Sequence, residues 1–184
     1  MSQAPLNPYA APKTDVVQEM AAGAGDWLPE ELSAFVGSKE KYYRRVWAPL
    51  MNGKSGLKAG FNGGAFFFNV LWLLHRKMYR EFLLFMIAPL TIGVLSAVVT
   101  LPPSVDAALD RAFNLAIACT VGFLGNGLYY RRTNAAIREA RHRDPVLATR
   151  LEDLRKRGGT TWLWPLVAVA AFGGVIVLGV MVSQ

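Results

Sequence analysis

Three long apolar runs dominate this chain of 184 residues. They cover residues 82–101, 109–130 and 161–182, and only the second contains charged side chains, which lie near its start. A helix needs about 20 apolar residues to cross the hydrocarbon core of a bilayer. The pattern therefore predicts an all-α integral membrane protein with three transmembrane helices, and it places Tyr129 and Tyr130 in an aromatic belt at the end of the second.

A shorter run, from Phe61 to Leu74, is strongly aromatic and ends at the basic residues His75, Arg76 and Lys77. Apolar runs of about 10–14 residues are too short to span a bilayer and more often lie at its interface, re-enter it or are buried. We therefore expect a short membrane-embedded or interfacial aromatic helix over residues 62–80. Whether it lies flat, re-enters or is buried among the spans stays open.

Residues 27–60 form an amphipathic helical region before the membrane domain. Its main helix carries an apolar stripe of Tyr42, Tyr43, Val46 and Trp47, and basic residues occupy the other face. A helix of this kind either lies on lipid headgroups at the cytoplasmic surface or packs as a cap on its own protein. Both interpretations remain open at this point.

A helical linker is expected over residues 131–159. The second apolar helix continues to about residue 142, and a further helix carries Leu147, Leu151 and Leu154 at helical spacing before two glycines end it. This leucine stripe either docks a partner protein or packs within the chain.

The first 26 residues are rich in Pro, Ala and Gly and contain little that could be buried. They predict a disordered cytoplasmic tail, in which Tyr9 is either a docking point or one more solvated residue. The expected organisation is thus a tail over 1–26, cytoplasmic or interfacial amphipathic helices over 27–60, and a membrane domain over 61–184.

The basic residues sort by position along the chain. Of 20 Lys and Arg, ten lie in residues 1–80, one in residues 102–111 and nine in residues 131–158. Cytoplasmic loops carry the excess of Lys and Arg, so the N-terminus and the 131–159 linker are expected in the cytoplasm and the C-terminus in the periplasm. A fourth crossing would place the two basic regions on opposite sides. The net charge of +7 then reflects topology, and no nucleic-acid partner is expected.

Motifs for chemistry are few. The chain has one cysteine, Cys119, and two histidines far apart, and it contains no P-loop, nucleophile elbow or paired-cysteine ligand set. We therefore expect no cofactor, no metal and no enzymatic activity.

Two groups of residues are singled out for other roles. Basic and aromatic side chains near the cytoplasmic interface are expected to contact lipid headgroups: Arg44, Arg45, Trp47, Trp72, His75, Arg76, Lys77 and Arg80. Small residues and one amide inside the spans are expected to support helix packing: Gly93, Ala97, Ala118, Gly122, Asn126, Ala170 and Gly174.

The chain resembles a family of small bacterial inner-membrane proteins that is catalogued only as a domain of unknown function. The resemblance covers roughly residues 32–161 and implies an inner-membrane location but no activity. It is carried by Phe35-Val36-Gly37 with Tyr42-Tyr43, by FN-x-x-AFFF-x-x-LWLL-x-RKMY from Phe61 to Tyr79, by Gly125-Asn126 with Leu128-Tyr129-Tyr130, and by Gly158-Gly159-Thr160-Thr161.

The leading hypothesis is a non-catalytic accessory subunit or adaptor that binds membrane lipids and either a protein partner or further copies of itself. Two alternatives are kept. One is a small transporter or channel component that uses Asn114, Thr120 and Asn126 along the second span. The other, ranked last, is a lipid-acting enzyme that uses the basic cluster at residues 75–77.

Overall fold

The protein is helical throughout the residues that the structure, a computed structural model, describes, which are 27–99 and 102–182. Its elements, in chain order, are α2 (Pro29–Val36), η1 (Gly37–Lys39), α3 (Glu40–Met51), η2 (Gly56–Ala59), α4 (Gly63–Phe68), α5 (Val70–His75), α6 (Tyr79–Val98), α7 (Pro103–Arg143), α8 (Leu147–Arg157) and α9 (Leu163–Val182).

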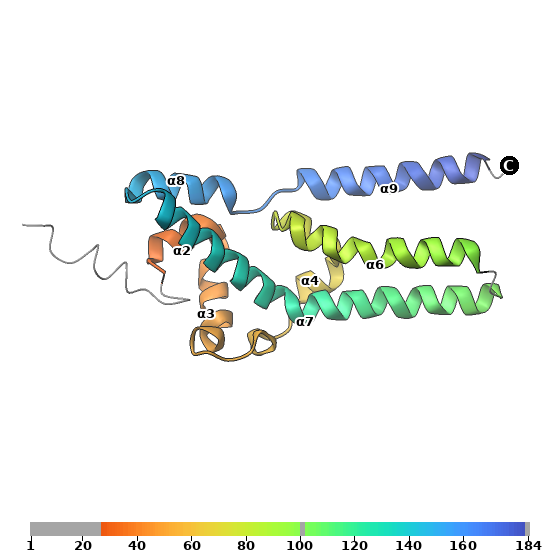
Figure 1. The fold of residues 1–184 in the computed structure, drawn as a ribbon, viewed down its shortest axis with the longest axis horizontal. Helices are drawn as coiled ribbons and strands as arrows, with labels where there is room; N and C mark the ends of the chain where they lie inside the picture. The colour runs from red at the N-terminus through yellow and green to blue at the C-terminus, as the bar shows by residue number, and fades with distance from the viewer. Residues whose placement is uncertain (1–26, 100–101, 183–184) are drawn as a thin grey trace, which may run out of the picture.

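The elements form two regions (Figure 1). Helices α2, α3 and α8 gather around the second half of α7, and we call this group the head. Helices α6, α9 and the first half of α7 extend from it in the same direction. Because α7 is one helix of 41 residues, it belongs to both regions. At about 1.5 Å per residue it is roughly 60 Å long, about twice the thickness of a bilayer's hydrocarbon core.

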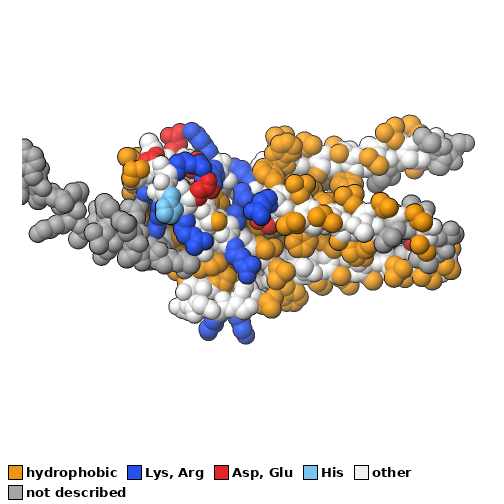
Figure 2. All heavy atoms as spheres, viewed as in Figure 1, with side chains coloured by type: hydrophobic (Ala, Val, Ile, Leu, Met, Phe, Trp, Pro, Cys, Tyr) orange, Lys and Arg blue, Asp and Glu red, His pale blue; other side chains and the backbone are white. Residues whose placement is uncertain are grey.

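Two of the described helices, α7 and α9, are long and apolar enough to cross a membrane. Only 11% and 6% of their most apolar stretches are buried, so neither is the covered core helix of a compact domain. Helix α6 has 20 residues and exposes Leu83, Leu90 and Val94 among other apolar side chains. Figure 2 shows the consequence on one face: hydrophobic side chains cover the extended region, and Lys and Arg gather over the head.

The predicted helix boundaries fit the observed elements in the linker. Helix α7 continues beyond residue 130 to Arg143, and α8 ends where Gly158 follows it, both as predicted. An added Cβ at Gly158 would lie 2.1 Å from the carbonyl oxygen of Phe35. The neighbouring amide, that of Gly159, donates a hydrogen bond of 2.7 Å to the same oxygen. The pair of glycines therefore ends α8 by letting its backbone pack directly on the end of α2.

The prediction of a single helix over residues 62–80 is wrong. The segment is divided at Asn69, whose φ of 50° interrupts the helix between α4 and α5, and the chain turns again at Lys77, whose φ is 56°. The ψ of Asn69 is −130°, so its backbone is far from helical and a single helix cannot continue through this residue. The two halves of the segment differ in environment: Phe67 on α4 is 82% exposed, whereas Leu73 on α5 is fully buried.

Aromatic side chains form the centre of the head. The ring centroid of Trp47 lies 5.5 Å from that of Tyr129 and 5.6 Å from that of Tyr130, and Tyr43 lies 4.9 Å from Tyr129. Trp27 contacts both Trp47 and Tyr130. The apolar stripe of α3 therefore faces α7. Of the two interpretations of this helix, the structure supports a cap that packs on its own protein. The two tyrosines, predicted as an interfacial belt, are core residues instead.

The long helices make few contacts with one another among the described residues. Helix α7 packs mainly against α4, and α9 against α5. A Cβ added at Gly122 would lie 2.7 Å from the ring of Phe61, whereas one added at Gly93 or Gly174 would meet no other described atom within 4 Å. Among the small residues predicted to pack one span against another, Gly122 is therefore in close contact within the chain, but its neighbour is Phe61 and not another span.

The remaining members of that predicted group are less enclosed. Ala118 is partly buried, Ala170 is exposed, and the side chain of Ala97 lies outside the described part of the structure. Within the part of the chain that the structure describes, Gly93 and Gly174 do not contact another span. Packing between copies of the chain stays a prediction.

Candidate functional site

A buried ionic cluster joins three helices of the head. Glu31 on α2 is fully buried, and its carboxylate lies 2.5 Å from a guanidinium nitrogen of Arg141 on α7 and 3.1 Å from one of Arg150 on α8. The same carboxylate accepts a hydrogen bond of 3.1 Å from the backbone amide of Leu28, which caps α2. One acidic side chain therefore fixes the relative positions of α2, α7 and α8.

Asn126 connects α7 to the segment before α4. Its side-chain oxygen accepts a hydrogen bond of 2.9 Å from Asn62, and its amide nitrogen donates to the carbonyl oxygens of Ala59 and Gly60. Its backbone oxygen accepts from the indole of Trp47 at 2.9 Å. Asn62 in turn caps α4, as its sequence position predicts, by accepting from the amide of residue 65. Asn126 thus holds α3, η2 and α4 against α7.

The three polar residues considered for transport do not share a face of α7. Asn114, Thr120 and Asn126 are spaced six residues apart. With about 100° of rotation per residue, six residues turn the helix by about 240°, so the three point in three different directions. Asn114 and Thr120 donate hydrogen bonds to backbone carbonyls one turn earlier, at 2.8 and 2.7 Å.

Three of the residues predicted to contact lipid headgroups are instead packed inside the protein. Trp47, Trp72 and Arg76 are 0%, 6% and 7% exposed. The guanidinium of Arg76 lies 5.0 Å from the ring centroid of Tyr43 and 5.1 Å from that of Tyr129, so it is held by two aromatic faces. Burial in this cluster raises the pKa of Tyr43 well above its usual range, although the charge of Arg76 opposes the shift.

His75 and Lys77 hold the segment between α8 and α9. Nδ1 of His75 lies 3.0 Å from the carbonyl oxygen of Thr161, and the amide of Thr161 donates to the carbonyl of His75 at 2.9 Å. Nζ of Lys77 donates to the carbonyl oxygen of Lys156 at 3.0 Å. Partial burial lowers the pKa of His75 and the nearby charge of Arg76 adds to this, against the raising effect of the Thr161 carbonyl. Both predicted headgroup ligands therefore have partners within the chain.

The other predicted lipid contacts are on the surface. Arg44, Arg45 and Arg80 are exposed, and Arg44 pairs with Glu40 one turn earlier at 2.7 Å. Their exposure is compatible with the predicted lipid contact, which stays a prediction.

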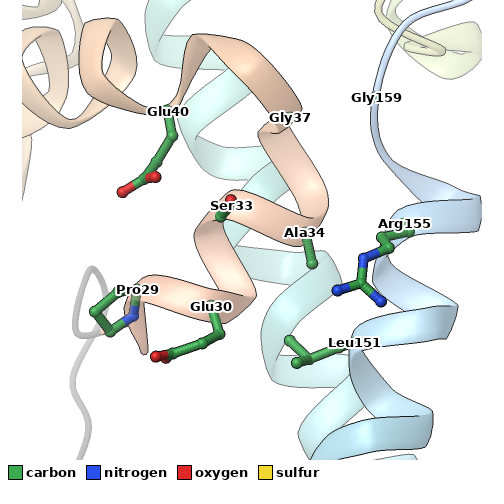
Figure 3. A pocket seen from close by; sticks show the side chains of 9 residues that line it. All are labelled: Pro29, Glu30, Ser33, Ala34, Gly37, Glu40, Leu151, Arg155 and Gly159. Carbon is green, nitrogen blue, oxygen red and sulfur yellow. The ribbon is translucent and has the colours of Figure 1, made fainter.

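The leucine stripe of α8 is largely internal. Leu154 is fully buried, Leu151 packs at the edge of the core, and Leu147 is exposed. Beside Leu151 a groove of about 650 Å³ runs between α2 and α8, with Glu30 and Arg155 on opposite sides (Figure 3). Because Leu154 is fully buried, it is not available for docking a partner. Leu151 and Leu147 remain candidate docking residues. The other proposed docking residue, Tyr9, lies outside the described residues.

A second cavity lies where α6 and α7 leave the head, and sequence reasoning missed it as a unit. It measures about 370 Å³, and besides Phe35, Ala135 and Ala136 its lining consists of charged side chains from three helices: Arg80, Arg131, Arg132, Arg157, Glu81 and Glu139. Only Arg80 among the arginines was singled out from the sequence. The others follow an apolar run or lie in the basic linker, and their convergence depends on how α6 and α8 pack beside α7.

Within the described ranges, no group of three His, Cys, Asp or Glu side chains is placed to hold a metal ion. Cys119 is a free thiol, partly buried on α7.

Comparison with protein families identifies the chain's family. The model of a family described as "Protein of unknown function (DUF2628)" matches residues 30–134. No curated protein and no solved structure matches the chain. The matched range begins with α2 and ends within the head half of α7, so it contains Asn62, Asn126 and the aromatic residues Tyr43, Trp47, Tyr129 and Tyr130 but not Trp27, α8 or α9.

Proposed function

The chain belongs to the family of proteins of unknown function DUF2628, and from this premise we propose that it is a membrane-anchored adaptor or accessory subunit. In this role α6, α7 and α9 cross the inner membrane of a bacterium, the head lies in the cytoplasm, and the C-terminus lies in the periplasm. The head binds a protein partner, and lipid headgroups bind the membrane domain at its cytoplasmic end. No catalytic step is assigned to it.

The observation that carries the proposal is the continuity of α7. About 20 residues of a helix suffice to cross a bilayer, so a helix of 41 residues extends from the membrane by about the same length again. The extending half is the backbone of the head and carries the buried ionic cluster and the aromatic core. A folded domain fixed in this way is held at one distance from the membrane, as a binding platform requires.

Charge and aromatic side chains support the orientation. Lys and Arg gather over the head, and the extended region is covered by hydrophobic side chains (Figure 2). Trp162 and Trp164 at the start of α9 are 59% and 49% exposed, and Phe67 on α4 points out of the protein at the same junction. Trp prefers the interface between water and hydrocarbon, so these side chains mark the cytoplasmic membrane boundary in the proposed arrangement.

Cysteine labelling tests the topology. In a Cys119→Ser background, Ser104→Cys reports on the first turn of α7 and Lys54→Cys on the head, and both positions are exposed. A membrane-impermeant maleimide, added to cells whose outer membrane has been permeabilised, is expected to label position 104 only. Position 54 should react only after the inner membrane is broken. Labelling of position 54 alone in intact inner membranes would reverse the proposed orientation.

The adaptor role is tested at the groove between α2 and α8. Native mass spectrometry of protein purified in mild detergent is expected to show a stoichiometric partner or a defined homo-oligomer. The double variant Glu30→Lys/Arg155→Glu exchanges the two exposed charges of the groove and should release that species. Lys54→Glu/Lys58→Glu, which changes charges away from the groove, should retain it. A strictly monomeric wild-type protein would contradict the role.

A further inference from the structure

We propose that the arginine-lined cavity between α6, α7 and α8 binds the phosphodiester headgroup of an anionic phospholipid. The inference rests on the proposed seating of α6 and α7 in a membrane and adds a defined ligand and site to it.

The position of the cavity fixes the kind of ligand that reaches it. Arg80 and Glu81 directly precede the apolar part of α6, which begins at Phe82, and Arg131 and Arg132 directly follow the apolar run 109–130 of α7, on its head half. The cavity therefore lies on the head side of the point where the apolar part of α6 begins. In a bilayer this level is occupied by lipid headgroups, and basic pockets between membrane helices on the cytoplasmic side bind them.

The charges that line the cavity favour an anion. Four arginines and two glutamates give a formal charge of +2. Arg157 already pairs with Glu139 and with Asp153, at 2.5 and 3.4 Å. The described residues provide no ion pair for Arg80, Arg131 or Arg132. Planar guanidinium groups bind phosphate oxygens through paired hydrogen bonds, and three of them are available here.

The charge of the cavity selects among phospholipids. Its lining carries a formal charge of +2, and Arg80 and Arg131 are exposed, so their guanidinium groups are accessible to a ligand. A phosphatidylglycerol-like headgroup brings a net negative charge to these groups, whereas a zwitterionic choline headgroup also brings a cation. The cavity therefore favours the anionic lipid.

Lipid titration followed by native mass spectrometry tests the proposal. The delipidated wild-type protein is expected to bind one phosphatidylglycerol in saturable fashion and phosphatidylcholine at least about tenfold more weakly, since each arginine near a net negative headgroup contributes about 1 kcal/mol. Arg131→Gln/Arg132→Gln should lose the preference. Arg44→Gln/Arg45→Gln removes the same charge from α3, away from the cavity, and should keep it.

The possible outcomes separate the alternatives. Equal loss in both double variants would show a non-specific charge effect and overturn the site. Competition by millimolar inorganic phosphate, with no preference between the lipids, would identify a soluble anion as the ligand and overturn the lipid assignment. If Arg131→Gln/Arg132→Gln lowers the melting temperature, Arg80→Gln/Arg131→Gln, in which both side chains are exposed, repeats the test. A failed lipid preference with the topology of the cysteine labelling intact refutes this site alone.

Discussion

The buried carboxylate of Glu31 makes a strong prediction about stability. Glu31→Gln keeps the size and shape of the side chain but removes the negative charge between Arg141 and Arg150. Those guanidinium groups lie 2.5 and 3.1 Å from the carboxylate, and the Arg150 side chain is only 2% exposed. After the substitution the two guanidinium groups lose the carboxylate that lies between them in the interior of the head.

The magnitude follows from the geometry. At an effective dielectric constant of about 20, a pair of opposite charges about 4 Å apart attracts by about 4 kcal/mol, and most of this is offset by desolvation while both partners are present. Removing one partner leaves the desolvation uncompensated and destabilises proteins by about 3–5 kcal/mol. For a unit of roughly 100 residues each kcal/mol lowers the melting temperature by about 4–8 °C, so we expect a fall of at least about 10 °C.

Tryptophan fluorescence during thermal unfolding in detergent measures the effect, because Trp27 and Trp47 lie in the head and report its packing. The matched control is Glu30→Gln, which changes the preceding and exposed glutamate. Surface substitutions of this kind change stability by about 0.5 kcal/mol or less. Equal melting temperatures for the two variants would refute the reasoning that Glu31 holds the three helices together.

Three further predictions concern packing, hydrogen bonding and pH. Gly158→Ala places a methyl group 2.1 Å from a carbonyl oxygen of α2, so it should disrupt the packing of α8 on α2 and lower the melting temperature. The control Gly93→Ala, which has open space around it, should change the melting temperature by no more than about 2 °C. Asn126→Leu removes three side-chain hydrogen bonds in a buried site and should destabilise by about 3 kcal/mol or more. The control, Asn114→Leu, changes an exposed residue and should cost little by the same fluorescence assay. Because the pKa of His75 is lowered from 6.5 in the folded protein, the unfolded chain binds its proton more readily, so stability should decline as pH falls below about 6.5. His75→Gln should flatten that decline, and an unchanged pH profile would remove this residue as its cause.

The hydrophobic pattern predicted the positions of the helices better than the packing environment of individual side chains. The runs that became α6, α7 and α9 were visible because an apolar helix has an unmistakable composition, and the glycine that ends α8 was visible because few other residues suit that position. The environment of Tyr129 and Trp47 was not visible. A tyrosine in an interfacial belt and a tyrosine in a protein core have the same local sequence, and only the packing of α3 on α7 separates them.

The site was harder to predict than the fold for the same reason. Asn126 was identified as a hydrogen-bonding residue, but its partner Asn62 is 64 residues earlier in the chain. The arginines at positions 131 and 132 were counted for topology, while their approach to Arg80 depends on the direction in which α6 leaves the head. The break at Asn69 was missed because the apolar run continues through it, and a single positive φ leaves no trace in a hydrophobicity pattern.

Helix α7 couples the extended region to the head through one continuous backbone, although it changes direction where it enters the head (Figure 1). Its head half of about 20 residues is roughly 30 Å long, so each 10° change in tilt displaces the far end by about 5 Å. In the proposed arrangement, a change in bilayer thickness that alters helix tilt would therefore move the groove between α2 and α8 relative to the membrane surface. Local compression of the lipid would then change the position of a partner bound in that groove.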